Sequence, residues 1–579
     1  PRWRTMATAN SLARTAPWDM RARCVLELRR RRVANPTKSL PELYAFDPAG
    51  YIRDRLGWEP WSGTAGNPGQ LQVLEAYTLA LRQQVERQAF EHGELSEGEL
   101  GYWKPGAVIQ NWVRIEAGHT VGKTKLAAGI TSHFHDCFVP SIGYTFAPGW
   151  DQINDLLWKE IRADREGKGL PGRVYEGSPE MRRSAQHFVK GRATNNAKGT
   201  GTERIQGQHG QFLIFVLDEA EGIADFVWDA MDSMTSGGVV IVVLLANPKT
   251  RTSRFHKART HSNVRSFRIS CLDHPNVVQG REVVPGAVRR DWVERNIEKL
   301  CEVVPSHDPD EMTFTVPYPV HSRGKEHPAG TIFRPDPDFM WRVLGRAPVN
   351  LADNTFVPVG RYEAAKARQP ELAEAWKARI GVDVARFGSD LGTLYVRWNG
   401  RAWRWARFAR KDTNAYARGV RDCAKWLAAQ GVTSLHVRVD GGGGFGGGLV
   451  DKIAPDLDLQ QSFRDFTVLE VHFNGTPHDD EAYADLVTEM YGEAAETLKG
   501  LALIDPPETL EADLTERTFG WVNRKARDVK KLTPKDKFRT DTGRSPDDGD
   551  GFVLAVAPDF LFEGRSALDP YISQSHYTG

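Results

Sequence analysis

Two uninterrupted apolar runs stand out in the first half of the chain. One covers residues 212–217 and ends in Asp218 and Glu219, and the other covers residues 239–246 and ends in Asn247. Continuous apolar runs of this length are typical of strands that are buried on both faces, as in a parallel sheet. The pattern therefore predicts an α/β fold whose strands deliver polar side chains to their carboxyl ends, where such sheets bind ligands.

In the second half, apolar and polar positions alternate over shorter runs. Residues 379–385 and 434–440 each read as a strand, with Asp383 near the end of the first and Asp440 at the end of the second. Between the halves lies a proline-containing stretch without a long apolar run, which is typical of a connector. The length of 579 residues fits two large domains.

A glycine-containing loop, Ala117–Thr124, precedes the first buried strand. It follows the strand-like residues 108–115 and precedes the helix-like residues 125–130. A strand, loop and helix in this order can bind phosphate oxygens through backbone N–H groups, with Lys123 reaching the β- and γ-phosphates and Thr124 holding Mg²⁺. The usual pattern opens with glycine where this chain has Ala117, and a plain turn is the alternative for such a loop taken alone. The glycines of the phosphate-binding prediction are Gly118 and Gly122.

The polar residues at the two strand ends fit the same chemistry. We expect Asp218 to hold Mg²⁺, directly or through water, and Glu219 to orient the water that attacks the γ-phosphate. The alternative is a core strand followed by an acidic helix start. Asn247 is the candidate for sensing the γ-phosphate, and an ordinary Asn-Pro turn is its alternative.

Aspartates on separate elements of the second half predict a metal site. Besides the two strand aspartates, Asp547 and Asp550 lie in or before the first turn of a helix predicted over the apolar residues 552–557. Hydrolysis of a phosphodiester by two metal ions requires several carboxylates that converge from different elements. Asp383, Asp440 and Asp547 have that make-up, and for each the alternative is a solvated turn or cap. Asp548 and Asp390 are further candidates in the same neighbourhood.

Three other segments bear on this site. The glycine run 441–448 would let backbone approach DNA or metal closely, with a flexible linker as its alternative. Residues 397–407 alternate basic and aromatic side chains, and residues 523–531 are basic, so both are candidates for phosphate contacts. For residues 397–407, a β-hairpin with one solvated face is an equal alternative.

Composition limits the possible functions without choosing one. The chain has 76 basic and 75 acidic residues, so binding to nucleic acid must depend on local clusters. Its five cysteines have no metal-ligand spacing, and no apolar run reaches the about 18 residues of a membrane helix. The sequence begins with Pro1, and residues before Met6 are expected to be an artefact of how the chain begins.

Several segments together resemble the large subunit of tailed-bacteriophage terminases, which packages double-stranded DNA and cuts it. The likeness runs from about residue 50 to the C-terminal region and is carried by residues 118–124, 146–152, 206–210, 217–223, 246–248 and 341–348. The resemblance implies an N-terminal P-loop ATPase with a mainly parallel sheet and a C-terminal RNase H-like nuclease. In this family, Asp547 matches the third acid position best, and Asp550 would be an auxiliary metal ligand.

The resemblance also implies further residues and partners. Pro60-Trp61 and Gln70 stand where the family binds adenine, and a helix start is the alternative for that segment. Where some members have an arginine in the phosphate loop, this chain has Gly118 and His119, so an arginine finger would come from elsewhere, with Arg251, Arg254 and a neighbouring subunit as sources. The expected cofactors are ATP and Mg²⁺, or Mn²⁺ at the nuclease site. The expected partners are double-stranded DNA, the portal protein of the procapsid, the terminase small subunit and further copies in a ring, in the host bacterial cytoplasm and without a membrane.

These inferences give one division of the chain and two rival functions. The predicted parts are an N-terminal extension (1–45), the ATPase (46–345), a linker (346–375), the nuclease (376–565) and a tail (566–579). One rival is a helicase or repair ATPase with a fused nuclease, which strand displacement would identify. The other is an inactive prophage component that binds DNA or docks on the capsid.

Overall fold

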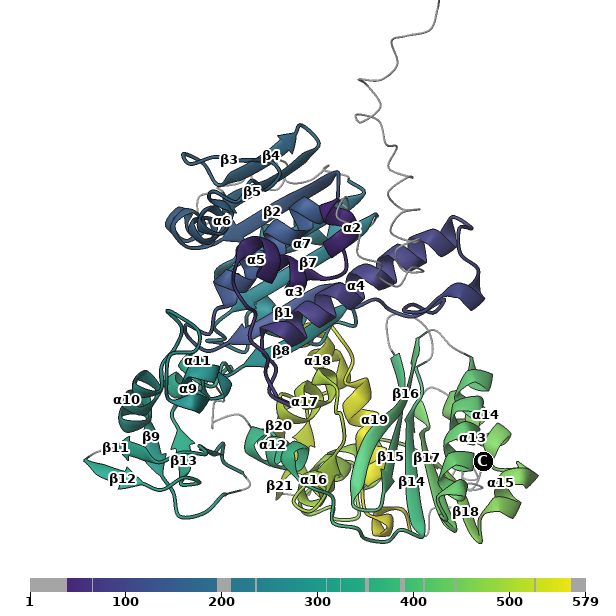
Figure 1. Ribbon diagram of the computed structural model, residues 1–579. Helices are drawn as coiled ribbons and strands as arrows, with labels where there is room; N and C mark the ends of the chain where they lie inside the picture. The colour runs from purple at the N-terminus through teal and green to yellow at the C-terminus, as the bar shows by residue number, and fades with distance from the viewer. Residues whose placement is uncertain are drawn as a thin grey trace, which may run out of the picture. The chain divides into compact units, whose positions relative to one another are not determined.

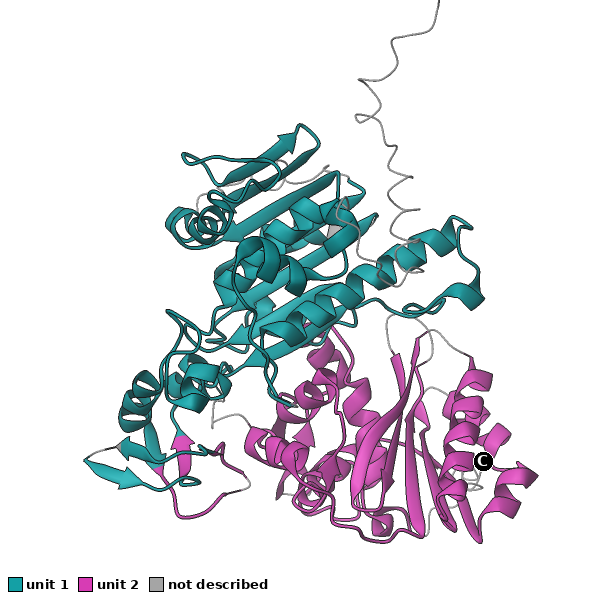
Figure 2. Cartoon of the chain, viewed as in Figure 1, with its two compact units in different colours: residues 1–302, 315–331, 335–348 teal, residues 303–314, 332–334, 349–579 magenta. Residues whose placement is uncertain are grey.

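A computed structural model describes residues 39–64, 66–194, 210–234, 237–308, 310–322, 324–348, 354–385, 391–409, 412–442, 445–524 and 527–563 (Figure 1). The chain divides into two compact units (Figure 2). Unit 1 comprises Pro1–Glu302, Thr315–Thr331 and Pro335–Pro348, and unit 2 comprises Val303–Phe314, Ile332–Arg334 and Val349–Gly579. The last passage between them, at residues 348 and 349, falls within the predicted linker. Among the described residues, no helix is long and apolar enough to cross a membrane.

An eight-stranded sheet forms the centre of unit 1, in the order β3-β4-β5-β2-β6-β7-β1-β8 (Figure 1). Neighbours from β5 to β8 in this order pair in parallel, whereas β3-β4 and β4-β5 pair antiparallel. The mainly parallel sheet predicted for the first half is thus confirmed. The strands are β1 (Trp112–Ala117), β2 (Ser141–Ala147), β3 (Arg173–Val174), β4 (Glu180–Ser184), β5 (His187–Ala193), β6 (Phe212–Leu217), β7 (Val239–Ala246) and β8 (Val264–Ile269).

The two uninterrupted apolar runs form β6 and β7, and every residue in both strands is buried. The strand expected over residues 108–115 is β1, which begins later, at Trp112, and the helix expected over residues 125–130 is the longer α5. The helices of unit 1 are α2 (Leu40–Tyr44), α3 (Pro48–Tyr51), α4 (Gln70–Glu91), α5 (Lys123–Cys137), α6 (Trp158–Arg165), α7 (Asp225–Met234), α8 (Arg254–Ala258), α9 (Pro275–Gln279), α10 (Arg290–Leu300) and α11 (Pro337–Arg342). Short strands follow α10, namely β9 (Cys301–Val303), β10 (Phe314–Thr315), β11 (Val320–Ser322), β12 (Lys325–His327) and β13 (Ile332–Pro335).

The strand order of unit 1 explains why its strand ends meet. β7 lies between β6 and β1, and all three run in the same direction. The carboxyl ends of β1, β7 and β6 therefore lie side by side. These ends carry the phosphate loop, Asn247 and the Asp218-Glu219 pair respectively.

Unit 2 contains a six-stranded mixed sheet in the order β18-β17-β14-β15-β16-β19. β14, β15 and β16 pair antiparallel, and β17 and β18 continue the sheet in parallel with β14. Three antiparallel strands followed by two parallel ones is the RNase H-like arrangement that the resemblance implies. The strands are β14 (Lys377–Asp383), β15 (Leu391–Trp398), β16 (Arg401–Ala409), β17 (Ser434–Asp440), β18 (Asp465–Val471) and β19 (Ala502–Leu503), with a separate hairpin of β20 (Phe519–Arg524) and β21 (Arg527–Leu532).

The helices of unit 2 bury both faces of this sheet in two apolar clusters. One cluster contains Val420 and Leu427 of α13 against β14, β15 and β17, and the other contains α16 and the whole apolar stretch of α19. α19 is the helix predicted near the C-terminus. The helices are α12 (Val359–Ala367), α13 (Thr413–Ala429), α14 (Phe445–Ile453), α15 (Leu457–Ser462), α16 (Leu486–Thr497), α17 (Glu508–Thr515), α18 (Lys535–Thr542) and α19 (Asp547–Val556).

Candidate functional sites

The predicted phosphate loop connects the end of β1 to the start of α5 and is tightly held. Gly118 donates its N–H to the Ile269 carbonyl at 2.9 Å, and His119 donates to the Arg342 carbonyl at 2.7 Å. A Cβ on Gly118 would lie 2.5 Å from the Cys271 sulfur, so only glycine fits there. Gly122 has φ +88°, a left-handed conformation that glycine adopts at little cost. The loop therefore depends on both predicted glycines, despite the alanine at its first position.

Lys123 and Thr124 connect this loop to the neighbouring strand ends. The Lys123 ammonium lies 2.5 Å from Asn247 Oδ1 and 3.3 Å from Glu219 Oε1. Thr124 Oγ1 donates to Asp218 Oδ2 at 3.3 Å. The structure thus brings together all five residues predicted for phosphate chemistry at the three strand ends.

Burial changes the acid strength of Asp218. The residue is 3% exposed. Burial, followed by the nearby Glu219 carboxylate, raises its pKa to about 6, although Lys123 opposes the shift. A buried carboxylate with neighbouring negative charge is stabilised by a cation, which fits the predicted role of Asp218 at Mg²⁺.

Asn247 joins the end of β7 to the end of β1. Its amide Nδ2 donates to the Ala117 carbonyl at 2.6 Å, while its Oδ1 accepts from Lys123. The residue is 6% exposed, so it is more than an ordinary surface turn residue. Its predicted role as a sensor of the γ-phosphate stays a prediction, and these contacts place it where that role requires.

Gln70, predicted to read adenine, contacts the phosphate loop instead. Its Nε2 donates to the Gly122 carbonyl at 3.0 Å, and its Oε1 accepts from the Trp61 backbone N–H at 3.2 Å. Trp61 Nε1 also donates to the Val121 carbonyl at 3.2 Å. Because both ends of the Gln70 amide are engaged, an adenine contact would require it to leave a partner. The helix start weighed as the alternative is present, since α4 begins at Gln70.

One candidate for an arginine finger is engaged within unit 1. Arg254 Nη1 lies 2.7 Å from Asp229 Oδ1 and donates to the Asp225 carbonyl at 2.9 Å. His119, one of the two residues predicted to stand in place of a loop arginine, has its ring 5.1 Å from that of Trp341 and 6.2 Å from that of Trp292. Burial, followed by the charge of Lys123, lowers the pKa of His119, so the ring does not supply a full positive charge at neutral pH.

In unit 2, the two strand aspartates lie side by side. β14 and β17 are parallel neighbours with Val382 opposite Val439. Asp383 and Asp440, the next residue on each strand, therefore lie next to each other at the same edge of the sheet. The Lys535 ammonium of α18 lies 3.8 Å from Asp383 Oδ1 and 3.9 Å from Asp440 Oδ2. It also lies 2.7 Å from Asp550 Oδ2, so a single cation joins acids from three elements.

The pKa shifts in this cluster show that its negative charges interact. Burial raises the pKa of Asp383 well above its usual range, and Asp547, Asp440 and Asp550 raise it further against the effect of Lys535. Burial also raises the pKa of Asp440. For Asp550, burial alone would raise the pKa, but Lys535 and Arg517 outweigh it and lower the pKa. The arrangement therefore favours a cation in contact with several carboxylates.

The first turn of α19 places its three aspartates differently. Asp550 faces Lys535, whereas Asp547 Oδ2 accepts the Leu391 backbone N–H at 2.9 Å. Asp548 points to another side, where it accepts from Tyr395 at 2.8 Å and Arg404 at 3.1 Å. Asp550 thus contacts Lys535, the charge of Asp547 acts on Asp383, and the contacts of Asp548 give it a structural role. The assignment of Asp547 as the third acid stays a prediction.

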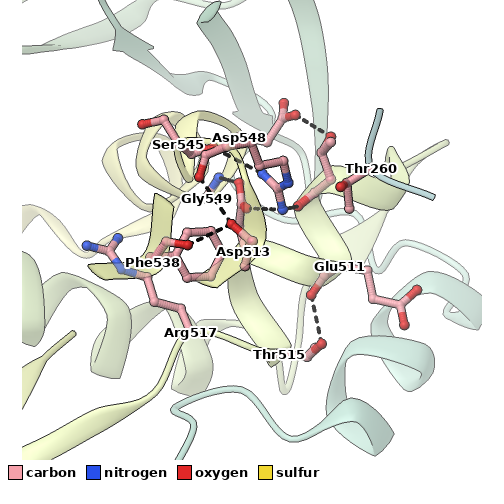
Figure 3. Close-up of polar contacts among 12 residues, drawn as sticks. Thr260, Glu511, Asp513, Thr515, Arg517, Phe538, Ser545, Asp548 and Gly549 are labelled. Atoms are coloured by element: carbon pink, nitrogen blue, oxygen red, sulfur yellow. Dashed lines mark hydrogen bonds and ion pairs between the residues drawn. The ribbon is translucent and has the colours of Figure 1, made fainter. Parts of the chain in front are cut away.

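Asp513 of α17 supports the same turn (Figure 3). Its Oδ2 accepts the Gly549 backbone N–H at 2.8 Å, and its Oδ1 lies 2.5 Å from Arg544. Pro546, which precedes α19, makes no side-chain cap, so Asp513 caps this helix from another element. Sequence reasoning missed both Asp513 and Lys535.

The residues of the acid cluster fit a divalent cation chemically but are not arranged as its ligands. Carboxylate oxygens from separate elements are the donors that Mg²⁺ and Mn²⁺ prefer. Within the described ranges, however, no three His, Cys, Asp or Glu side chains form a group that could hold a metal ion. Lys535 stands among the acids instead. The predicted metal ligands Asp383, Asp440, Asp547 and Asp550 therefore stay a prediction.

The remaining predicted segments are placed as follows. The glycine run is partly helical because α14 begins at Phe445, and Gly442 donates its N–H to Asp440 Oδ1 at 2.9 Å. A Cβ on Gly446 would lie 2.0 Å from the Asp440 carbonyl oxygen, so glycine is required beside this acid. The two basic segments form hairpins, β15-β16 and β20-β21. Asp390 and residues 525–526 lie outside the described residues.

Comparison with protein-family models and with curated proteins found no match. Similar solved structures include the large terminase of a thermophilic bacteriophage, with 12% identity, coverage of 76% of this chain and 94% of that chain, and a TM-score of 0.29. They also include the nuclease domain of the large terminase subunit gp2 of bacterial virus Sf6, with 16% identity, 35% and 99% coverage and a TM-score of 0.28. A third is a variant of the large terminase ATPase domain of Thermus phage P74-26, with 16% identity, 34% and 88% coverage and a TM-score of 0.25.

All three proteins are large terminase subunits of phages, the family that the sequence resembles. The first of them was also solved with ADP, and a variant of the Sf6 domain was solved with manganese. Superpositions with TM-scores this low carry no argument about function. The function of the chain therefore has to be inferred from the residues of its two sites.

Proposed function

We propose that unit 1 binds and hydrolyses ATP. The observation that supports this most directly is the Lys123 ammonium, which lies within 3.3 Å of both Asn247 and Glu219 at the end of a glycine loop. Lys123 would bind the β- and γ-phosphates, and Thr124 with Asp218 would hold Mg²⁺. The metal would neutralise charge on the phosphates.

Glu219 is positioned to act on water. Its backbone is left-handed, with φ 51° and ψ 47°, and its carboxylate is 33% exposed while that of Asp218 beside it is buried. A partly exposed carboxylate next to the phosphate loop can accept a proton from a water molecule and orient it for attack. Bound phosphate would compete for Lys123, which would release Glu219 for this task.

For unit 2, the proposal is a metal-dependent DNA endonuclease. Asp383, Asp440 and Asp547 would hold Mg²⁺ or Mn²⁺, with Asp550 as an auxiliary ligand, and the metal would activate water and stabilise the leaving oxygen. Lys535 would balance the carboxylates before a metal binds. The raised pKa of Asp383 and Asp440 is the expected sign of acids that are built to share a cation.

The two activities in one chain support the large subunit of a tailed-phage terminase. In this role, ATP hydrolysis would drive double-stranded viral DNA into a procapsid, and the nuclease would cut concatemeric DNA to start and end packaging. The proposed partners are duplex DNA, the portal protein, the small subunit and further copies of the chain in a ring. The proposed place of action is the host bacterial cytoplasm.

One preparation of the full chain tests both activities, with each variant serving as the control for the other. Lys123→Ala should abolish ATP hydrolysis and retain plasmid cleavage in Mn²⁺, whereas Asp383→Asn should do the reverse. Cleavage that survives both Asp383→Asn and Asp550→Asn would refute the nuclease site. Unwinding of a forked duplex by the wild-type protein would favour the helicase or repair enzyme. If the wild-type protein neither hydrolysed ATP nor cleaved DNA, the inactive prophage component would be favoured.

A further inference from the structure

A row of basic side chains crosses one face of the unit 2 sheet. Arg397 of β15 lies opposite Arg379 of β14, and Arg379 lies opposite His436 of β17. Lys377 and Arg438 share this face, because each lies two residues from a member of the row. Like charges directly opposite each other on neighbouring strands are destabilising. Such a row requires negative charge nearby.

A single aspartate, Asp559, compensates most of this charge. Its carboxylate accepts from Lys377 at 2.8 Å, from Arg379 at 2.5 Å and from His436 at 3.2 Å, and it also pairs with Arg438. These ion pairs lower the pKa of Asp559 far below its usual range, although burial alone would raise it. One carboxylate therefore contacts three cationic side chains and a histidine.

Arg397 is the member of the row that this aspartate does not reach. Within the described part of the chain, it makes no ion pair with a carboxylate, and its Nη1 donates to the Val556 carbonyl at 2.6 Å. Burial, followed by repulsion from Arg379, lowers its pKa to about 10, although the charges of Glu374 and Asp559 oppose the shift. The contact with Val556 caps the end of α19 but uses only one of the five N–H groups of the guanidinium. The other N–H groups of Arg397 have no acceptor among the described residues, so they are available to a ligand.

A cavity of about 240 Å³ opens onto these cations. Its wall includes Lys377, Arg379 and Arg397, together with Asn399 and Gly400 of the turn between β15 and β16. It also includes two acids, Glu371 and Glu374, and the Glu374 carboxylate lies 3.8 Å from Arg379 Nη1 and is 55% exposed. The volume is below the about 300 Å³ at which drug-sized ligand pockets begin. The cavity therefore suits a small anionic group.

We propose that this cavity binds a phosphate group through Arg397, Arg379 and Lys377. The site is separate from the acid cluster, since Lys377 and Asp383 stand at opposite ends of β14, about 20 Å apart at the usual rise of a strand. Arginine recognises phosphate through parallel N–H groups, and the phosphate would give Arg397 an anionic partner in direct contact. The phosphate can belong to a DNA backbone or to a free phosphate compound, and these two sources have the same chemistry at this cavity.

The test is calorimetric titration of the full chain with inorganic phosphate, in a Lys123→Ala background that weakens binding at the phosphate loop. Arg397→Gln should weaken binding about tenfold or more, because it removes a charged donor. Glu374→Gln should strengthen binding about threefold, because it removes a competing exposed carboxylate without disturbing the core. Arg418→Gln, at an exposed position on α13, is the charge-matched control and should leave binding unchanged.

A second arm identifies the source of the phosphate. Binding of a short fluorescent duplex is measured by anisotropy in EDTA, with the same variants. If Arg397→Gln weakens binding of both the duplex and inorganic phosphate, the ligand is the DNA backbone. If it weakens binding of inorganic phosphate alone, the ligand is a free phosphate compound. The proposal is overturned if the background protein binds no phosphate at millimolar concentration, or if Glu374→Gln fails to strengthen binding. The Glu374→Gln result tests the proposal even if the Arg397→Gln protein does not fold. Neither result depends on whether the acid cluster cuts DNA.

Discussion

Lys535→Met should destabilise the protein in a strongly pH-dependent way. The substitution keeps a long apolar side chain and removes the ammonium that lies 2.7 Å from Asp550, 3.8 Å from Asp383 and 3.9 Å from Asp440. Burial alone would lower the pKa of Lys535, but these three acids raise it well above its usual range. The interaction is therefore strongly favourable to the charged lysine.

The magnitude follows from the charges that remain. At an effective dielectric constant of about 20, each unit pair about 4 Å apart is worth about 4 kcal/mol before desolvation. Removing one partner of a buried ion pair costs about 3–5 kcal/mol in practice. The lower end applies here because the Lys535 side chain is 34% exposed, so solvent screens its ion pairs, and because Asp550 keeps Arg517 at 2.9 Å. We expect the free energy of unfolding to fall by about 3 kcal/mol at pH 8.

The dependence on pH has a definite sign. A carboxyl group whose pKa is raised in the folded state holds more protons there than in the unfolded chain, so the stability falls as pH rises from about 4 through the folded pKa. In the variant, the acids relieve their repulsion by taking up a proton. Protonating one aspartate costs about 1.5 kcal/mol at pH 5 but more than about 5 kcal/mol at pH 8. The loss of stability should therefore be at most about 1.5 kcal/mol at pH 5.

Urea unfolding of the two proteins at pH 5 and pH 8 measures these differences. Lys537→Met is the matched control, because Lys537 is exposed on the same helix, and it should change stability by less than about 0.5 kcal/mol at either pH. Equal losses at pH 5 and pH 8 for Lys535→Met would refute the reasoning. So would a loss below about 1 kcal/mol at pH 8, because the ammonium would then not be balancing the acids.

Two further substitutions test the supports of the two sites. Gly118→Ala would place a Cβ 2.5 Å from the Cys271 sulfur and 2.7 Å from the Val343 carbonyl oxygen. It should therefore bind a fluorescent ATP analogue at least about tenfold more weakly in a titration. Gly177→Ala is the control and should bind the analogue normally, because a Cβ there would meet nothing within 4 Å. Asp513→Ala would leave the Gly549 N–H without its acceptor and would remove the carboxylate that pairs with Arg544. It should lower the free energy of unfolding in urea by about 2–3 kcal/mol and reduce DNA cleavage, while ATP hydrolysis continues. Wild-type stability in Asp513→Ala, equal to that of the exposed control Asp422→Ala, would show that α19 needs no cap from α17.

The strands that position the site of unit 1 were predictable because burial on both faces leaves a continuous apolar run in the sequence. Residues 212–217 and 239–246 are apolar throughout, and they form fully buried parallel strands. Residues after such strands must lie at the sheet edge, so Asp218 and Asn247 could be placed without coordinates. Gly118 and Gly122 were predictable because the loop requires close packing and a left-handed backbone.

The contacts made across the fold were not predictable. Lys535 lies in a basic segment where its neighbours are exposed, and nothing in its local pattern indicates three acid partners. Whether Asp547 or Asp550 is the third acid depends on the rotation of α19 about its axis. Residues three apart on a helix lie on the same side of it, so the sequence alone does not separate the two. Gln70 fits an adenine site by its position in the chain, yet only the fold shows that the Gly122 carbonyl and the Trp61 N–H hold its amide.

α19 shows why the supporting residues matter as much as the acids. Its C-terminal carbonyls are bound by arginines of the sheet, with Arg438 reaching Leu554 and Ala557 and Arg397 reaching Val556. Its N-terminal turn is held by Asp513 through Gly549 and by Arg404 through Asp548. These contacts at both ends of the helix oppose its rotation and translation, and they hold Asp550 facing Lys535. The position of Asp550 in the acid cluster therefore depends on residues outside it, and a change at one of these supports should reduce cleavage.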